Sequence, residues 1–303
     1  MSTRVAVVDL GSNSTRLLIA DLADDGTITE RERRSVVTRL GTGVEATGRL
    51  DGAAMERVFA TLADYRELID AAHADHAVGV LTSAVRDAGN GAAFTARVRD
   101  EFGIAAMTIP GEVEARLTYL GATSERRSTE PTAVIDIGGG STEVVVGAGA
   151  AILFHVSTQI GVVRHSERHL HDDPPSPEQL AQLREDAAAT FAAQVTPERT
   201  ATHAVAVAGT ATQCAAMLGT DTLERAELER LLANLAAVPL DERRQTPGLD
   251  PDRAPTIVAG VAILLEALAI LGLRVAEASD HDVLRGAVLE HSAFLRSHPQ
   301  FSG

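Results

Sequence analysis

Apolar and polar positions alternate with two different periods along this 303-residue chain, and each period predicts a different element. Short β-branched apolar runs at 5–8 and 133–135 each lead through a glycine-containing polar turn into a second apolar run, at 17–20 and 144–146. A run–turn–run pattern of this kind is typical of a buried β-hairpin. The sequence therefore predicts one hairpin near the start of each half of the chain.

The first half continues with a helical period. Apolar residues recur every three or four positions over 53–72, which predicts a helix with Asp51 as its N-cap. The other elements expected in this half are strands at 29–38, 77–81 and 105–109, and helices at 94–102 and 112–121. Their order is strand–strand–strand–helix–strand–helix–strand–helix.

The second half repeats this plan after a polar stretch at 124–131. We expect a third strand near 151–156, a helix over 177–194 with Ser176 and Pro177 at its start, and a strand at 204–208. The polar stretch predicts a domain boundary, so we expect one domain over 1–124 and a second over 125–303.

One apolar segment approaches the length of a membrane span. Residues 257–273 are nearly all apolar, but Glu266 lies inside the segment and Arg253 and Arg274 bound it. We expect a buried core helix and no membrane association. The single cysteine, Cys214, excludes an internal disulfide, and Asp9 interrupts the only apolar run near the N-terminus, so we expect a cytoplasmic protein.

Charge narrows the range of partners. The formal net charge of −15 argues against broad nucleic-acid binding, which needs a basic surface. All 27 basic residues are arginine, so neither a lysine Schiff base nor the lysine of a P-loop is available. A polyanionic substrate would therefore have to meet a local basic patch. The arginines that could form this patch are Arg31, Arg33, Arg34, Arg39, Arg126 and Arg127. For most of them, the favoured alternative is a place on a solvated face.

The turn of the second hairpin has the residues of an anion and cation site. Its glycines, Gly138 to Gly140, let backbone N–H groups approach a phosphate closely. Asp136 and Glu143 flank the turn and could hold a divalent cation. The alternative is a glycine-rich hairpin with two solvated carboxylates. The first hairpin repeats the design with Asp9, Gly11, Ser12, Asn13 and Arg16.

Two further residues lie at the ends of predicted elements. Arg86 follows a strand end, where the alternative is a surface loop arginine. Glu112 and Glu114 lie in the first turn of a helix, where acidic residues commonly do no more than complement the helix dipole.

Together these motifs resemble the exopolyphosphatase/guanosine pentaphosphatase (Ppx/GppA) family of the actin-like superfamily. Thr82, Arg86, Ala88 and Asn90 match the family's Thr-x-x-x-Arg-x-Ala-x-Asn pattern, and Gly111 to Arg116 matches its Gly-x-x-Glu-Ala-Arg motif. The resemblance implies an α/β fold of two actin-like (ribonuclease H-like) domains with an interdomain cleft. It also implies Mg²⁺-dependent release of the terminal phosphate from inorganic polyphosphate, of short chain by analogy, and a homodimer.

The resemblance assigns roles to single residues. Glu114 would activate water, Arg86 would neutralise developing charge, and Asp136 and Glu143 would hold Mg²⁺. The phosphate-binding residues would be Gly11, Ser12, Asn13, Arg16, Gly138, Gly139, Gly140 and Ser141. The alternatives are a pppGpp 5′-phosphohydrolase, a non-catalytic sensor of (p)ppGpp or polyphosphate, and a sugar kinase or ATPase of the same superfamily.

Three other segments do not add a functional assignment to this resemblance. Ala208-Gly209 replaces the glycine pair of most relatives, so nucleotide binding is not supported. Ser279 to Gly286 resembles the family's closing Ser-x-x-x-x-x-Arg-x-Gly stretch, but Gly286 lies one place early, so Arg285 is given no role. His165, His169 and His171 invite a metal-site interpretation, but no second ligand cluster follows at zinc spacing, so a solvated loop is favoured.

Overall fold

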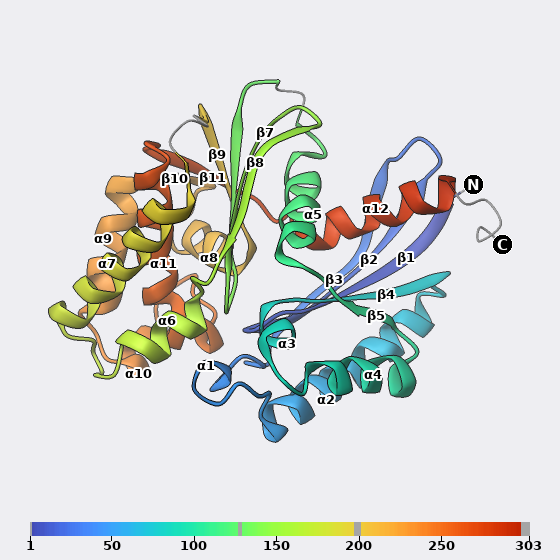
Figure 1. The fold of residues 1–303 in the computed structure, drawn as a ribbon, viewed down its shortest axis with the longest axis horizontal. Helices are drawn as coiled ribbons and strands as arrows, with labels where there is room; N and C mark the ends of the chain where they lie inside the picture. The colour runs from blue at the N-terminus through green and yellow to red at the C-terminus, as the bar shows by residue number, and fades with distance from the viewer. Residues whose placement is uncertain (1, 127–128, 197–200, 298–303) are drawn as a thin grey trace. The chain divides into compact units, whose positions relative to one another are not determined.

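The computed structural model describes residues 2–126, 129–196 and 201–297, which belong to two compact units (Figure 1). The first unit comprises the chain up to Ser124 together with the part from His281 onward, and the second runs from Glu125 to Asp280. The break after Ser124 lies where the polar stretch predicted it. The prediction that the second domain extends to residue 303 is wrong, because the last helix packs on the first unit.

The first unit is built on a five-stranded mixed sheet. Its strands are β1 (Ser2–Leu10), β2 (Ser14–Ala23), β3 (Ile28–Val37), β4 (His76–Leu81) and β5 (Ala105–Thr108). β1 pairs antiparallel with β2 and parallel with β4, which gives the order β3-β2-β1-β4-β5.

Helices cover both faces of this sheet (Figure 1). They are α1 (Val44–Thr47), α2 (Gly52–Ala71), α3 (Ser83–Asp87), α4 (Gly91–Phe102), α5 (Gly111–Thr123) and α12 (Val283–Ser297). Successive residues of a strand point to opposite faces. Ala6 and Val8 of β1 accordingly pack in the core on the side of α2 and α4, and Val5 and Val7 pack in the core that includes Val283 of α12.

Two glycines let α12 lie against α5 at backbone distance. A Cβ atom on Gly286 would lie 1.8 Å from the Leu117 carbonyl oxygen, and one on Gly121 would lie 2.0 Å from the Asp282 carbonyl oxygen. Only glycine permits so close an approach of two backbones. Next to this contact, Leu284 and the apolar residues around it join the core of β1 and β2. The C-terminal helix therefore completes the first unit.

The second unit contains a six-stranded sheet of order β10-β11-β9-β6-β7-β8. The strands are β6 (Thr132–Ile137), β7 (Thr142–Ala148), β8 (Ala151–Thr158), β9 (His203–Val207), β10 (Thr222–Glu224) and β11 (Val275–Ala278). β6 pairs antiparallel with β7 and parallel with β9, as β1 does with β2 and β4. The two short strands β10 and β11 are elements that the sequence did not predict.

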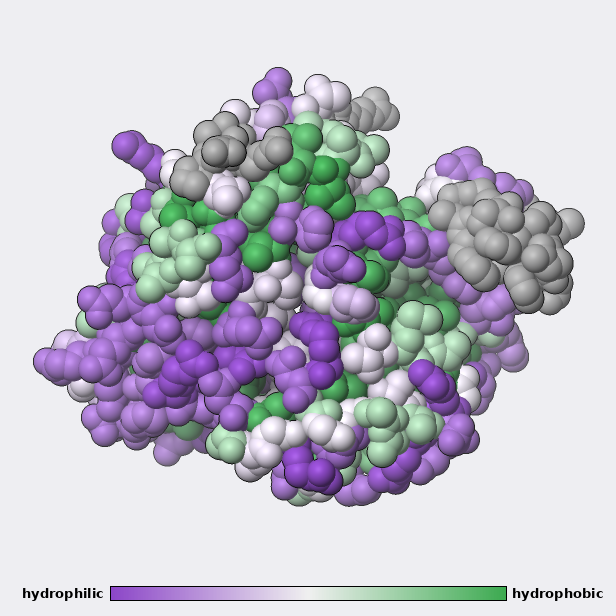
Figure 2. Space-filling model, in the orientation of Figure 1, coloured by the Kyte–Doolittle hydropathy of each residue, from purple (hydrophilic) through white to green (hydrophobic). Residues whose placement is uncertain are grey.

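The helices of this unit surround one large aliphatic core. They are α6 (Val162–His169), α7 (Pro177–Gln194), α8 (Ala208–Leu218), α9 (Arg225–Ala236), α10 (Leu240–Arg243), the 3₁₀ helix η1 (Pro251–Arg253) and α11 (Ala254–Ile270). α7 buries a single stripe, Leu183, Ala187 and Phe191, as expected of an amphipathic helix. On the face that Figure 2 shows, the surface over α6 and α7 is largely hydrophilic.

Within the described residues, one helical stretch, Pro251–Ile270, is long and apolar enough to cross a membrane. An 18-residue window of this stretch is 67% buried, and Ile257, Val261 and Leu264 of α11 lie in the core of the second unit. The prediction of a buried core helix is confirmed.

Candidate active site

The turn between β1 and β2 is held by its carbonyl groups. The Gly11 N–H donates to the Ser14 carbonyl at 3.0 Å, which closes the turn. The Ser12 carbonyl accepts from Gly41 N at 2.7 Å, and the Asn13 carbonyl accepts from Thr38 N. In a trans peptide the N–H points opposite to the carbonyl before it. The N–H groups of Asn13 and Ser14 therefore point away from the 38–41 segment, available to an anion.

The same turn has polar side-chain atoms that are buried but lack partners. Among the described residues, Asn13 Oδ1, Ser14 Oγ and Asp9 Oδ1 have no hydrogen-bond partner. Such atoms cost about 1–3 kcal/mol each unless something binds them, so they point to a ligand. Burial raises the pKa of Asp9 despite the neighbouring Arg16. Ser14 and Asp9 were not assigned roles from the sequence, although the repeated Asp-x-Gly pattern pointed to Asp9.

Arg16 has a different environment from the one expected of a phosphate ligand. Its Nη2 lies 2.6 Å from Asp9 Oδ2, and its Nη1 donates to Asp282, just before α12. The guanidinium is thus held between two carboxylates, and we leave Arg16 out of the proposed phosphate ligands.

The turn between β6 and β7 repeats this construction. The Gly138 N–H donates to the Ser141 carbonyl at 2.9 Å. The carbonyls of Gly138 and Gly139 accept from Val162 N and Val163 N at the start of α6, and that of Gly140 accepts from the Arg164 side chain. The N–H groups of Gly139, Gly140 and Ser141 must then point away from α6. Three successive N–H groups on one side are a set of donors that suits an anion.

Asp136 and Glu143 are paired residues of this hairpin, directly opposite each other on β6 and β7. Asp136 is 5% exposed and Glu143 is 1% exposed, so the alternative of two solvated carboxylates is wrong. The Ser157 hydroxyl of β8 donates to Glu143 Oε1 at 2.6 Å and fixes its orientation. Two buried carboxylates side by side are an oxygen donor set that suits a hard divalent cation.

Arg86 and Glu114 come together in the first unit. Arg86 lies at the end of the short helix α3, not on a surface loop, and Glu114 lies in the first turn of α5. Arg86 Nη1 donates to the Ile109 carbonyl at 2.9 Å and to Glu114 Oε2 at 3.1 Å. Glu114 is buried, whereas Glu112 in the same turn is exposed. This burial separates Glu114 from an ordinary partner of the helix dipole.

The first hairpin and the Arg86 helix are joined directly. The Ala84 N–H, in the first turn of α3, donates to Ser12 Oγ at 3.0 Å. Ser12 therefore positions the helix that bears Arg86, and its hydroxyl proton remains able to donate to a phosphate oxygen.

The arginines considered for a basic patch are mostly neutralised. Arg31 pairs with Asp21, Arg33 with Glu30, Arg34 with Glu32, and Arg126 with Glu277. Arg127 lies outside the described residues. The alternative of a solvated, ion-paired face accounts for these four residues.

Two remaining segments differ from their predicted environments. His165 and His169 lie on α6 rather than on a solvated loop, and His165 is buried.

Arg285 is also buried. Its Nε donates to Ser124 Oγ at 2.9 Å, so Arg285 has a structural contact close to where α12 packs on α5. Cys214 is core, as predicted.

The proteins to which this chain is similar in sequence include two exopolyphosphatases. The chain is 36% identical over 314 residues to exopolyphosphatase 2 of Mycobacterium tuberculosis, covering 95% of this chain and 98% of that protein. It is 28% identical to exopolyphosphatase 1 of Mycobacterium bovis, covering 94% and 87% of the two chains.

Solved structures of similar proteins have the same fold as this chain. A Ppx/GppA family member of Aquifex aeolicus superposes with a TM-score of 0.80 at 30% identity, over 98% of this chain and 99% of that one. An exopolyphosphatase-like protein superposes with a TM-score of 0.89 at 29% identity, over 97% and 100%. These similarities confirm the predicted α/β fold. Because the Ppx/GppA phosphatase family also matches residues 18–293, the chain belongs to that family.

Proposed function

We propose that this protein is an exopolyphosphatase, which hydrolyses the terminal phosphoryl group of inorganic polyphosphate. The observation on which the proposal chiefly rests is the buried Glu114 fixed by Arg86 at 3.1 Å. A carboxylate held in this way can orient a water molecule and accept its proton. Membership of the family and the similarity to curated exopolyphosphatases support the choice of substrate class.

In the proposed reaction, the oxygen of water bonds to the terminal phosphorus while the proton of that water passes to Glu114. The bond from phosphorus to the bridging oxygen breaks, and the shortened polyphosphate leaves with that electron pair. Arg86 positions Glu114 and adds positive charge near the phosphoryl group. Because the transition state is largely dissociative, orientation and charge matter more than nucleophile strength.

The phosphate ligands follow from the two turns. Asn13 N–H and Ser12 Oγ would bind phosphate oxygens in the first unit, and the N–H groups of Gly139, Gly140 and Ser141 would do so in the second. Backbone N–H groups recognise phosphate without a net positive surface, which suits a chain of net charge −15.

Asp136 and Glu143 would hold Mg²⁺. Their register and burial fit the ion, because a divalent cation offsets the repulsion between two adjacent buried carboxylates. When bound, Mg²⁺ would neutralise phosphate charge.

The test is phosphate release from short polyphosphate and from pppGpp at equal concentration, with and without Mg²⁺. Glu114→Gln keeps the shape of the side chain and removes the base, so we expect a loss of about 10²–10⁴-fold in kcat. Glu112→Gln is the matched control, since this exposed residue lies in the same helical turn.

Three outcomes would overturn parts of the proposal. Faster turnover of pppGpp would replace the substrate and keep the site. Tight polyphosphate binding without release by the wild type would indicate a sensor. Equal activity of Glu114→Gln and the wild type would remove Glu114 from the mechanism.

A further inference from the structure

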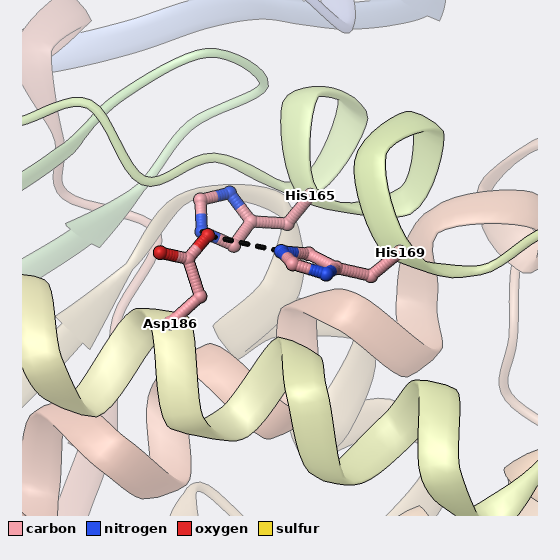
Figure 3. Close-up of side chains that lie close together, drawn as sticks. All are labelled: His165, His169 and Asp186. Atoms are coloured by element: carbon pink, nitrogen blue, oxygen red, sulfur yellow. Dashed lines mark hydrogen bonds and ion pairs between the residues drawn. The ribbon is translucent and has the colours of Figure 1, made fainter.

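Three potential metal ligands of the second unit converge between α6 and α7 (Figure 3). His165 and His169 are four residues apart on α6, so both rings project from the same face of the helix. Asp186 of α7 lies opposite them, and the ligand atoms of all three residues lie within 4.8 Å of one another.

The geometry around Asp186 is close to that of a coordination site. His169 Nε2 lies 2.9 Å from Asp186 Oδ2, and His165 Nε2 lies 3.6 Å from the same oxygen. His165 is 1% exposed, and its Nε2 has no hydrogen-bond partner among the described residues. A buried ring nitrogen pointing at two other ligands without a hydrogen bond of its own is an observation that calls for a ligand.

We propose that His165, His169 and Asp186 bind one divalent transition-metal ion of the zinc class. Two imidazoles and one carboxylate are a ligand set found in tetrahedral zinc sites that keep a fourth position open. Imidazole nitrogen selects zinc, cobalt or nickel over magnesium, which prefers oxygen ligands. The site is therefore chemically distinct from the carboxylate pair Asp136 and Glu143.

Burial favours the form of His165 that a metal requires. It lowers the pKa of His165 to about 4, so the ring is neutral at pH 7. A neutral imidazole is the form that binds a metal ion.

Several contacts of the metal-free chain compete with the ion, among them the hydrogen bond between His169 Nε2 and Asp186 Oδ2 at 2.9 Å. Gly161 N–H donates weakly to His165 Nδ1 at 3.4 Å, which assigns the ring proton to Nε2. Coordination through Nε2 moves that proton to Nδ1, and the Gly161 contact must then break. Arg168 Nη1 also donates to Asp186 Oδ2 at 2.9 Å and competes with an ion for that oxygen. Binding of the ion therefore requires these contacts to rearrange.

Gly161 links the proposed metal site to the neighbouring turn between β6 and β7. A Cβ atom on Gly161 would lie 2.4 Å from the Gly139 carbonyl oxygen, so Gly161 packs directly on the turn between β6 and β7. The residue whose contact must change when the metal binds therefore touches the glycines that precede Glu143.

The experiment titrates tag-free, chelator-treated full-length protein with Co²⁺ in excess Mg²⁺, which fills oxygen sites. The readouts are the visible absorption of bound Co²⁺ and the number of ions retained after dialysis. We expect one Co²⁺ per chain, displaced by Zn²⁺. His169→Ala and Asp186→Asn should each weaken binding by about tenfold or more, whereas Arg168→Ala should tighten it because the competitor for Asp186 is gone.

His171→Ala is the matched control, since this exposed histidine lies two residues from His169 but outside the cluster. Thermal melts of each variant show whether it remains folded. The proposal is overturned if His169→Ala binds Co²⁺ as the wild type does, or if the wild type retains no Co²⁺ below about 1 mM. A loss of binding in His171→Ala equal to that in His169→Ala would also overturn it.

Discussion

Asp136 and Glu143 face each other in register on adjacent antiparallel strands, and both carboxylates are buried. The equivalent pair of the first hairpin is Asp9 and Arg16, also in register. One hairpin thus balances its aspartate with an arginine of the chain, whereas the other sets two acids together. The second arrangement is the pair at which we propose that Mg²⁺ binds.

The first prediction concerns this pair. Glu143→Gln removes one negative charge from the paired position, so we expect it to abolish Mg²⁺-induced stabilisation and phosphate release. In wild-type protein, Mg²⁺ at 100 times its Kd should stabilise the fold by about 2.7 kcal/mol. Thermal melts with and without Mg²⁺ measure the difference, with the exposed Glu178→Gln as control. Unchanged Mg²⁺ stabilisation in Glu143→Gln would show that the ion binds elsewhere.

The second prediction concerns the contact of α12 with α5. Gly286→Ala inserts a Cβ atom 1.8 Å from a backbone oxygen, so the helices must separate. We expect a loss of about 1–3 kcal/mol in the free energy of unfolding, together with lower activity because α5 bears Glu114. Denaturant melts measure the loss. Gly52→Ala, where a Cβ atom meets no other atom within 4 Å, should leave stability nearly unchanged.

Ala208, at the start of α8, gives the third prediction. Its φ is 63°, a left-handed conformation that costs an alanine about 1–2 kcal/mol. Ala208→Gly relieves this strain but increases the entropy of the unfolded chain, so we expect a net gain of about 0.5–1 kcal/mol. Ala216→Gly, inside the same helix, should instead destabilise by about 1 kcal/mol. Thermal melts of the two variants should shift in opposite directions.

The fourth prediction is a pH dependence. The hydrogen bond from Arg4, which lies 2.6 Å away, lowers the pKa of Asp21 to about 2 from its usual 3.8. Because the folded pKa is the lower one, this ion pair stabilises the fold fully above a pH of about 5 and loses its effect as the pH falls towards 2.

Asp21→Asn should therefore cost about 1 kcal/mol at pH 7 and about half as much at pH 3. Urea melts at the two pH values measure this, with the exposed Asp64→Asn as control. A difference between variant and wild type that stays constant down to pH 3 would contradict the ion-pair explanation.

The hairpins, most of the helices and the division after Ser124 could be predicted because their signals are local. Alternating apolar residues, the glycines of each turn and the caps at Asp51 and Ser176 act within a few residues of one another. Both caps form as predicted: Asp51 accepts from Ala54 N, and Ser176 accepts from Gln179 N.

The errors arise where distant residues decide the environment. The ion pair of Arg16 with Asp282 could not be foreseen because the two residues are 266 positions apart, and the phosphate role of Arg16 stays a prediction. His165 looked solvated because its neighbours are polar, yet α6 turns it inward. Residues 281–303 looked like the end of the second domain because nothing local reveals that Gly286 packs on α5.

The packing of α12 on α5 constrains the order in which the two units can fold during synthesis. The second unit is one continuous segment, from Glu125 to Asp280, inserted between the two parts of the first. Every residue of that unit is synthesised before α12, whereas the first unit cannot bury the face of β1 and β2 that contacts the α12 residue Val283 until α12 has been made. The half of the protein that is made first is therefore the half that is finished last.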